Sequence, residues 1–178
     1  MIACLRFIGL INAAIWLGAV VFFTLGASPA CVSPEMETLL GAKNFPFFSG
    51  AVAQLVAVRY FSVVSVTAVI ALLHLVAEWL YMGRPTRKFS LALLAGLLAL
   101  VLFGGFWVEP RLEKLHATRY AANTQSDQRE AAAKSFRLWH AGARVLNLIM
   151  LAGLVVYVWR VANPNDAPRF ISSVKFRS

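Results

Sequence analysis

The side chains with the clearest chemical potential lie in the last apolar stretch of the chain, FRLWHAGARVLNLIMLAGLVVYVWR. If this stretch is helical, four polar residues fall within an arc of about 80°: Arg137, His140, Arg144 and Asn147. The uncharged part, Val145–Trp159, is only about 22 Å long as a helix, whereas the hydrocarbon core of a bilayer is roughly 30 Å thick. Either this helix is short, or its polar first turns lie in the membrane against a partner.

The nearest candidates to compensate the charge of Arg144 are Glu109 and Glu113, at the outer end of the preceding apolar segment. They are four residues apart and share a helix face. Because an unpaired charge facing lipid costs several kcal/mol, we expect an ion pair between Glu109 and Arg144 inside the bundle. The alternative is structural. A long arginine side chain reaches the headgroups without a partner, and an asparagine can hydrogen-bond a neighbouring helix.

A second polar set lies near the other end of the predicted helices. His74 and Glu78 are spaced i, i+4, and Asn12 on the first segment should lie at a comparable depth. A histidine above a glutamate could bind a cation or transfer a proton. It could equally be a satisfied contact near the membrane surface, since Glu78 lies about one turn from the end of its segment.

No other motif in the sequence indicates catalysis. The three His, two Cys and four Met residues show no C-x-x-C, H-x-x-x-H or M-x-x-M spacing. There is no Gly-rich phosphate loop and no nucleophile motif. We therefore expect neither an enzyme nor a cofactor, and we leave any metal unassigned.

The elements that must position these residues are membrane-spanning helices. The chain has 178 residues, of which 60% are hydrophobic, and a mean hydropathy of +0.69, values typical of a membrane protein. Backbone groups in lipid must bond within their own segment, so each apolar stretch is a helix. We predict an all-α, antiparallel four-helix bundle in residues 1–163, followed by a cytoplasmic tail, 164–178. The expected spans are about 7–27, 60–82, 89–108 and 138–159.

The basic residues indicate the orientation. The formal charge is +9, from 17 Lys and Arg against 8 Asp and Glu. We attribute this excess to basic loops and anionic lipid rather than to nucleic acid. The loop GRPTRK carries Arg84, Arg87 and Lys88 without an acid, whereas the opposing segment, 109–137, mixes both signs. Both termini are therefore expected in the cytoplasm, with the protein in the cell (inner) membrane.

The segments on the outer side are expected to be helical too. Ser33 as N-cap and Pro34 as first residue predict a short helix. The stretch from Pro46 to Met82 is about 55 Å long if continuous, so it either projects beyond the bilayer or bends, with Gly50 as a candidate. Helical sequence also flanks ANTQSD. The bundle should therefore extend beyond the outer membrane face.

Three motifs, taken in order, resemble the transmembrane protein 205 family over about residues 5–160. They are KNFPFF with Phe45 and Pro46, FWVEPR with Trp107, Glu109, Pro110 and Arg111, and FRLWHAGARVLNL with Phe136, His140, Asn147 and Leu148. The bacterial members are often labelled only as a domain of unknown function with four helices. The family favours a small hydroxyl residue three positions after the histidine, where this chain has Ala143.

The resemblance implies a small multi-pass membrane protein without a defined substrate. The eukaryotic member is associated with resistance to a platinum drug, for which export is one explanation, and some bacterial relatives look distantly like copper-resistance membrane domains. Our first functional hypothesis is a transporter or resistance factor for a small cation or soft metal complex. Four short helices leave little room for a pathway, so transport would need a homo-oligomer. The alternative is a non-catalytic structural or accessory subunit of a larger membrane complex. The residues of the outer candidate cluster are Glu109, Arg111, His140, Arg144 and Asn147.

Overall fold

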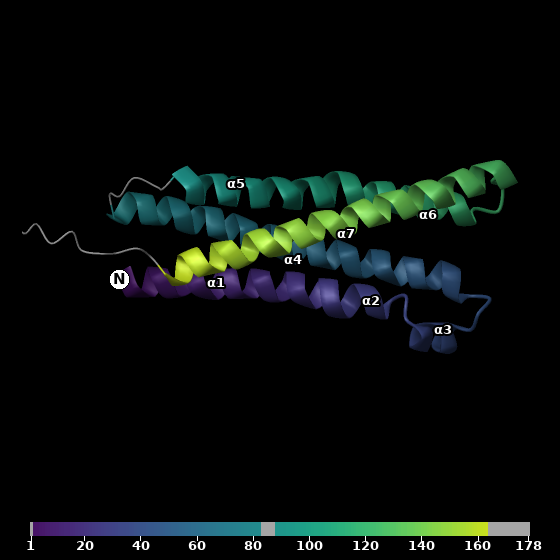
Figure 1. Ribbon diagram of the computed structural model, residues 1–178, viewed down its shortest axis with the longest axis horizontal. Coiled ribbons are helices and arrows are strands. Elements are labelled where there is room, and N and C mark those ends of the chain that lie inside the picture. Colours follow the sequence, from purple (N-terminus) through teal and green to yellow (C-terminus); the bar gives the residue numbers. More distant parts are fainter. Residues whose placement is uncertain (1, 83–87, 164–178) are drawn as a thin grey trace, which may run out of the picture.

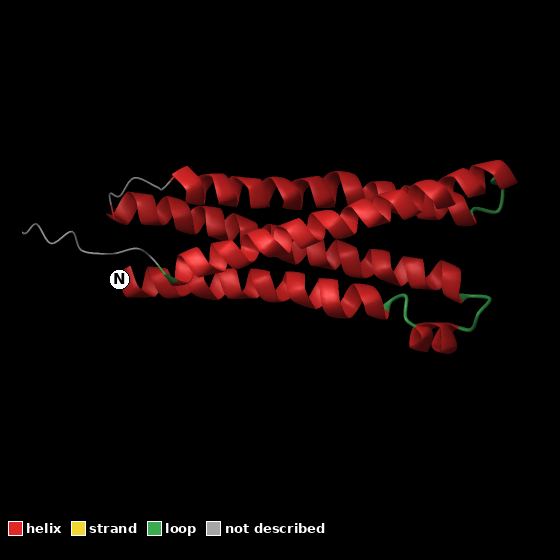
Figure 2. Ribbon diagram, in the orientation of Figure 1, coloured by secondary structure: helices red, strands yellow, loops and turns green. Residues whose placement is uncertain are grey.

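The protein is a bundle of long helices in a computed structural model, which describes residues 2–82 and 88–163 (Figures 1 and 2). Four helical rods are long and apolar enough to cross a membrane, which confirms the predicted fold class. The elements are α1 (Ile2–Phe22), η1 (Phe23–Ala27), α2 (Ser28–Ala30), α3 (Pro34–Leu40), α4 (Phe45–Met82), α5 (Lys88–Phe103), η2 (Gly104–Val108), α6 (Glu109–Tyr120) and α7 (Ser126–Ala162). The two η segments are π-helical turns inside otherwise α-helical rods.

The rods alternate in direction around the bundle. α1 packs against α4 and α7, and α5 packs against the same two helices on the other side. The start of α1 and the end of α7 lie at one end of the molecule, whereas α3 and α6 lie at the other (Figure 1). The interior is filled by side chains with almost no exposed surface: Trp16, Val20, Val64, Leu94, Val101 and Leu154. The antiparallel topology follows from the short connections between successive rods.

Glycine allows two of the helix contacts to be unusually close. A Cβ atom at Gly9 on α1 would lie 2.4 Å from the His74 ring of α4, and one at Gly104 on η2 would lie 2.5 Å from the Phe61 ring. Each ring therefore packs directly against the backbone of the neighbouring helix. Small residues serve in this way in membrane bundles, where close packing holds helices together.

Charged residues predict the limits of the membrane-embedded part. They bracket an uncharged stretch on each of three rods: Arg59 and Glu78 on α4, Lys88 and Glu109 on α5–α6, and Arg144 and Arg160 on α7. These stretches are about 28, 31 and 24 Å long, close to the roughly 30 Å of a hydrocarbon core. With these limits the first turns of α7 would stand outside the membrane, which would account for its short uncharged run.

The end of the bundle that carries α3 and α6, called the outer part here because the sequence predicts that it faces outward, has the expected helices. Ser33 caps α3, its Oγ accepting from the Met36 N–H at 3.2 Å, and Pro34 is the first residue of that helix. α6 and α7 flank the ANTQSD stretch as predicted. α4 runs without interruption through Gly50, so it projects beyond the bilayer rather than ending at a bend.

Part of the sequence prediction concerns residues outside the described ranges. The loop with Arg84 and Arg87 and the tail 164–178 belong to this part. The orientation of the termini and the choice of the inner membrane remain predictions, as do the exact span limits.

The two glycines of α1, Gly9 and Gly18, provide a test of close packing, because only Gly9 lies against a side chain of another helix. Gly9→Ala should lower the free energy of unfolding by about 1–3 kcal/mol, because its methyl group overlaps the His74 ring. Gly18→Ala meets nothing within 4 Å and should be neutral or stabilise the protein by up to about 1 kcal/mol. Thermal unfolding of both variants in the same detergent measures the difference. Equal effects at the two positions would contradict the close contact at Gly9.

Candidate functional site

A polar layer crosses the outer half of the membrane-embedded bundle. The Tyr60 hydroxyl on α4 donates to Asn147 Oδ1 on α7 at 2.7 Å, and Asn147 Nδ2 donates to Thr24 Oγ1 in η1. The Thr24 hydroxyl in turn donates to the Val20 carbonyl at 2.6 Å. Hydrogen bonds between side chains connect helices in lipid, where water does not compete. The structural alternative for Asn147 is the one this geometry supports.

Aromatic rings extend this layer between the two π-helical turns. Phe23 in η1 stacks on Tyr60 with 4.0 Å between ring centroids, and Tyr60 lies 5.1 Å from Phe61. The Phe61 ring then packs against Gly104 in η2. A π-helical turn takes in an extra residue, and such turns are frequent at functional sites. Here both turns border the same layer of hydrogen-bonded and aromatic side chains.

The polar stripe of α7 faces the interior only in part. His140 and Asn147 are half-buried, whereas Arg137 and Arg144 are exposed. The buried face of α7 carries Ala132, Met150, Leu154 and Tyr157. The centre of the stripe is rotated by roughly 100° from that face. Only His140 and Asn147 of the stripe are therefore turned partly toward the interior, and its two arginines face outward.

The expected ion pair between Glu109 and Arg144 does not form in the described part of the chain. Arg144 is exposed, and its electrostatic neighbour is His140. Glu109 is half-buried beside Glu113, and Arg111 is exposed. The physical reason is depth. Arg144 lies at the edge of the hydrocarbon core, where an arginine side chain reaches the headgroups and needs no buried acid.

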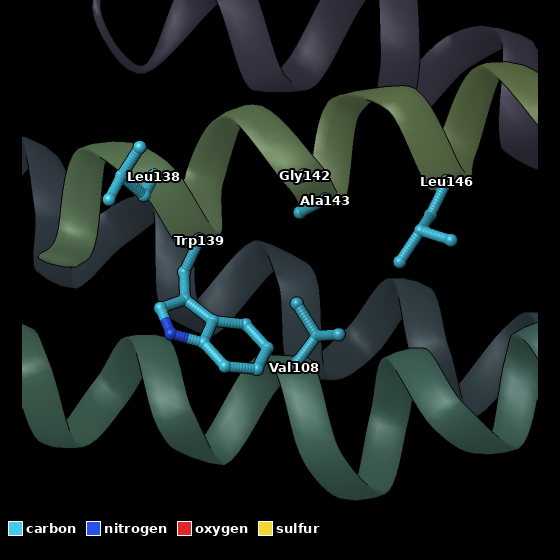
Figure 3. A pocket seen from close by; sticks show the side chains of 6 residues that line it. All are labelled: Val108, Leu138, Trp139, Gly142, Ala143 and Leu146. Atoms are coloured by element: carbon cyan, nitrogen blue, oxygen red, sulfur yellow. The ribbon is translucent and has the colours of Figure 1, made fainter.

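A shallow apolar hollow lies where α7 passes η2. Its volume is about 200 Å³, and Figure 3 shows Trp139 reaching toward the neighbouring helix while Gly142 and Ala143 leave the space beside Leu146 open. The lining residues are Val108, Leu138, Trp139, Gly142, Ala143 and Leu146. None of the five residues of the outer candidate cluster lines it. This hollow therefore offers no polar environment for an ion.

The second polar set connects α1 to α4. Asn12 Nδ2 donates to the Thr67 carbonyl at 2.9 Å, and His74 Nε2 lies 2.8 Å from the Leu5 carbonyl. Since a carbonyl only accepts, His74 carries its hydrogen on Nε2. Glu78 is half-buried and interacts electrostatically with Tyr157 on α7. The histidine thus bonds to backbone rather than to Glu78, and this set acts as helix contacts.

Sequence reasoning missed His116 on α6. Its side chain is buried, and its Nε2 atom has no hydrogen-bond partner. The signal was the helical spacing of half-buried Leu112, Leu115 and Tyr120, which places His116 on the inward face. Gln54 on α4 also has a buried Nε2 atom without a partner. Both lie outside the uncharged stretches of their rods, on the side of the bundle that carries α3 and α6.

A comparison with known families places the chain. The family profile described as a domain of unknown function, DUF4149, matches residues 11–121. The chain belongs to this DUF4149 family. No curated protein and no solved structure matches it. The matched range includes Tyr60, His74 and His116 but ends before α7, where Asn147 lies. The more specific resemblance to the transmembrane protein 205 family stays a prediction.

The polar layer should contribute measurably to stability. Tyr60→Phe removes the hydroxyl that donates to Asn147, and Asn147→Leu removes the amide. We expect a coupling of about 0.5–1.5 kcal/mol between the two substitutions, the range found for hydrogen bonds between membrane helices. A double-mutant cycle on unfolding in mixed micelles measures this coupling. Additive effects would show that the bond does not stabilise the bundle.

The same method tests the absence of the outer ion pair. Glu109→Gln and Arg144→Gln should be additive within about 0.5 kcal/mol, because the two side chains do not interact. A coupling well above that value, or restored stability on exchanging the two charges, would contradict the arrangement described here.

Proposed function

We propose that the protein is a non-catalytic accessory subunit that binds another membrane protein through the outer part of α4. The observation that carries this proposal is an exposed apolar stripe, defined here as Phe47, Phe48, Leu55 and Val58. These residues fall within about 100° around the helix. All of them precede Arg59, the predicted limit of the hydrocarbon core on α4, and beyond that limit lipid would not cover them. Apolar surface of this kind marks protein-binding sites.

The internal polar groups support the same proposal. Asn12, His74 and Asn147 each bond a neighbouring helix, so they contribute to packing rather than lining a path. A bundle of this kind holds its outer surface rigidly in place. Rigid presentation of an apolar face lowers the entropy lost when a partner binds.

The competing hypothesis is export of a small cation or soft metal complex. It requires donor side chains that gather along a path. Within residues 2–82 and 88–163, no three His, Cys, Asp or Glu side chains come together in a way that could hold a metal ion. Burial also raises the pKa of the Cys31 thiol, which disfavours the thiolate that binds soft metals. The accessory function therefore has more support.

Photocrosslinking from two positions on α4 tests the proposal. A photoreactive residue at Leu55, which is 70% exposed, should form one discrete protein adduct in native membranes. The same residue at Leu73, which is 62% exposed but within the hydrocarbon core, should react with lipid only. Phe48→Ser should abolish the adduct at Leu55, whereas the matched change Val66→Ser should not.

Two results would contradict the accessory function. One is lipid adducts alone at both positions. The other is a lower cellular content of copper, silver, zinc or platinum in cells that express the protein, if the effect depends on His140 and Glu109. The second result would favour export. A protein adduct with the mass of two chains would identify the partner as a second copy.

A further inference from the structure

Two histidines pack on glycines in the same way at opposite ends of the bundle. His74 lies on Gly9, and His116 lies on Gly50. A Cβ atom would lie 2.4 Å from His74 Nε2 at the first glycine and 2.2 Å from His116 Nε2 at the second. Both side chains are buried, with 8% and 6% of their surface exposed. Each imidazole is thus pressed edge-on against the backbone of a neighbouring helix.

The two contacts differ in the hydrogen bond of Nε2. At Gly9, the carbonyl four residues earlier, that of Leu5, lies 2.8 Å from His74 Nε2. The equivalent carbonyl before Gly50 is that of Pro46, and it accepts from the Tyr120 hydroxyl at 2.8 Å. His116 Nε2 is left without a partner. This atom therefore lies against the α4 backbone without the carbonyl partner that His74 Nε2 has.

Aromatic rings enclose the rest of the His116 ring. The centroids of Phe47, Tyr120 and Phe136 lie 5.6, 4.9 and 6.2 Å from that of His116. The backbone of Phe47 favours the charged ring, but burial and Arg119 outweigh it, so the pKa of His116 is lowered. The environment is therefore apolar, apart from this one backbone contact.

The ionisable groups around His116 do not favour a positive charge. On α6 its electrostatic neighbour is Arg119, a cation, whereas the acid three residues before His116, Glu113, is exposed to solvent. The part of α4 against it, Phe45–Val58, contains no charged residue. On α7, His140 stacks on the far side of Phe136. The ionisable side chains of α7 nearest in sequence to Phe136, apart from His140, are exposed to solvent: Glu130, Lys134 and Arg137. Burying a cation here without a paired anion costs several kcal/mol.

We propose that the contact between His116 and Gly50 is a pH-sensitive closure of the outer part of the bundle. The neutral imidazole holds α6 against α4, and protonation separates them. The closed form excludes the proton, whereas an open form takes it up near pH 6.5, the ordinary value for histidine. Closure is therefore complete above that pH and weakens as the pH falls, by up to about tenfold per pH unit. This inference does not depend on the accessory function.

Hydrogen exchange on the whole chain in lipid nanodiscs tests the closure. Amide protection in residues 45–58 and 109–120, corrected for the intrinsic effect of pH on exchange, should fall about tenfold between pH 7.5 and pH 5.5. Residues 68–78, around His74, should keep their protection, because His74 Nε2 has its acceptor. Unchanged protection in the outer segments over this range would overturn the proposal.

Two variants separate His116 from the other nearby histidine. His116→Gln keeps a polar side chain of similar length but cannot titrate, so it should remove the dependence on pH. His140→Gln should retain the full tenfold change. A pH response that survives in His116→Gln, or disappears in His140→Gln, would assign the effect elsewhere.

A spectroscopic measurement on the unchanged protein covers the case in which His116→Gln does not fold. The NMR signals of the His116 ring should change with pH only in step with the loss of amide protection. A ring that titrates near pH 6.5 while residues 45–58 stay protected would overturn the proposal.

Discussion

The hydrogen bond between Tyr60 and Asn147 fixes the position of α7 relative to α4, two helices whose backbones are not neighbours in the bundle. Neither group can bond to water in hydrocarbon, so each needs the other. The bond also sets depth. Arg59 directly precedes Tyr60, and Arg144 lies one turn before Asn147, so the two arginines reach the same level of the membrane. The contact thus aligns the two charged residues that predict the edge of the embedded region on α4 and α7.

Beyond Arg59 and Arg144, the same helices are predicted to leave the bilayer for water. Inside the bilayer, small residues and buried apolar side chains hold the helices together, and lipid covers the outward faces. Outside it, α4 meets α6 through His116, Tyr120 and Phe47, and the Tyr120 hydroxyl bonds the Pro46 carbonyl. If this part lies outside the bilayer, as the charged residues predict, water surrounds the outward face of α4 and its exposed apolar stripe is unfavourable there. Exposed apolar residues are therefore favourable in the membrane part of α4 and unfavourable in its outer part.

The two histidine–glycine contacts show how one packing motif acquires two properties. Both rings use a glycine to approach a neighbouring backbone. His74 completes its hydrogen bonding with a carbonyl of the helix it touches, and it is a permanent helix contact. At His116 a tyrosine one turn further along the same helix occupies the equivalent carbonyl. The difference lies in the competing donor rather than in the histidine or the glycine.

Much of the architecture was determined by the sequence alone. Uncharged runs of membrane-spanning length dictate helices because the backbone has no other partner in lipid, and Ser33 with Pro34 specifies the start of α3. The sequence also located Asn12, His74 and Asn147 as polar positions. Only the tertiary structure decided which way they face and what they bond. Spacing on one helix gives relative angles, but the direction of the interior depends on the other helices. For this reason the sequence did not reveal that the arginines of α7 face outward and that the Glu109–Arg144 pair does not form. Nor did it reveal that His116 is buried, although charged residues surround it in the sequence.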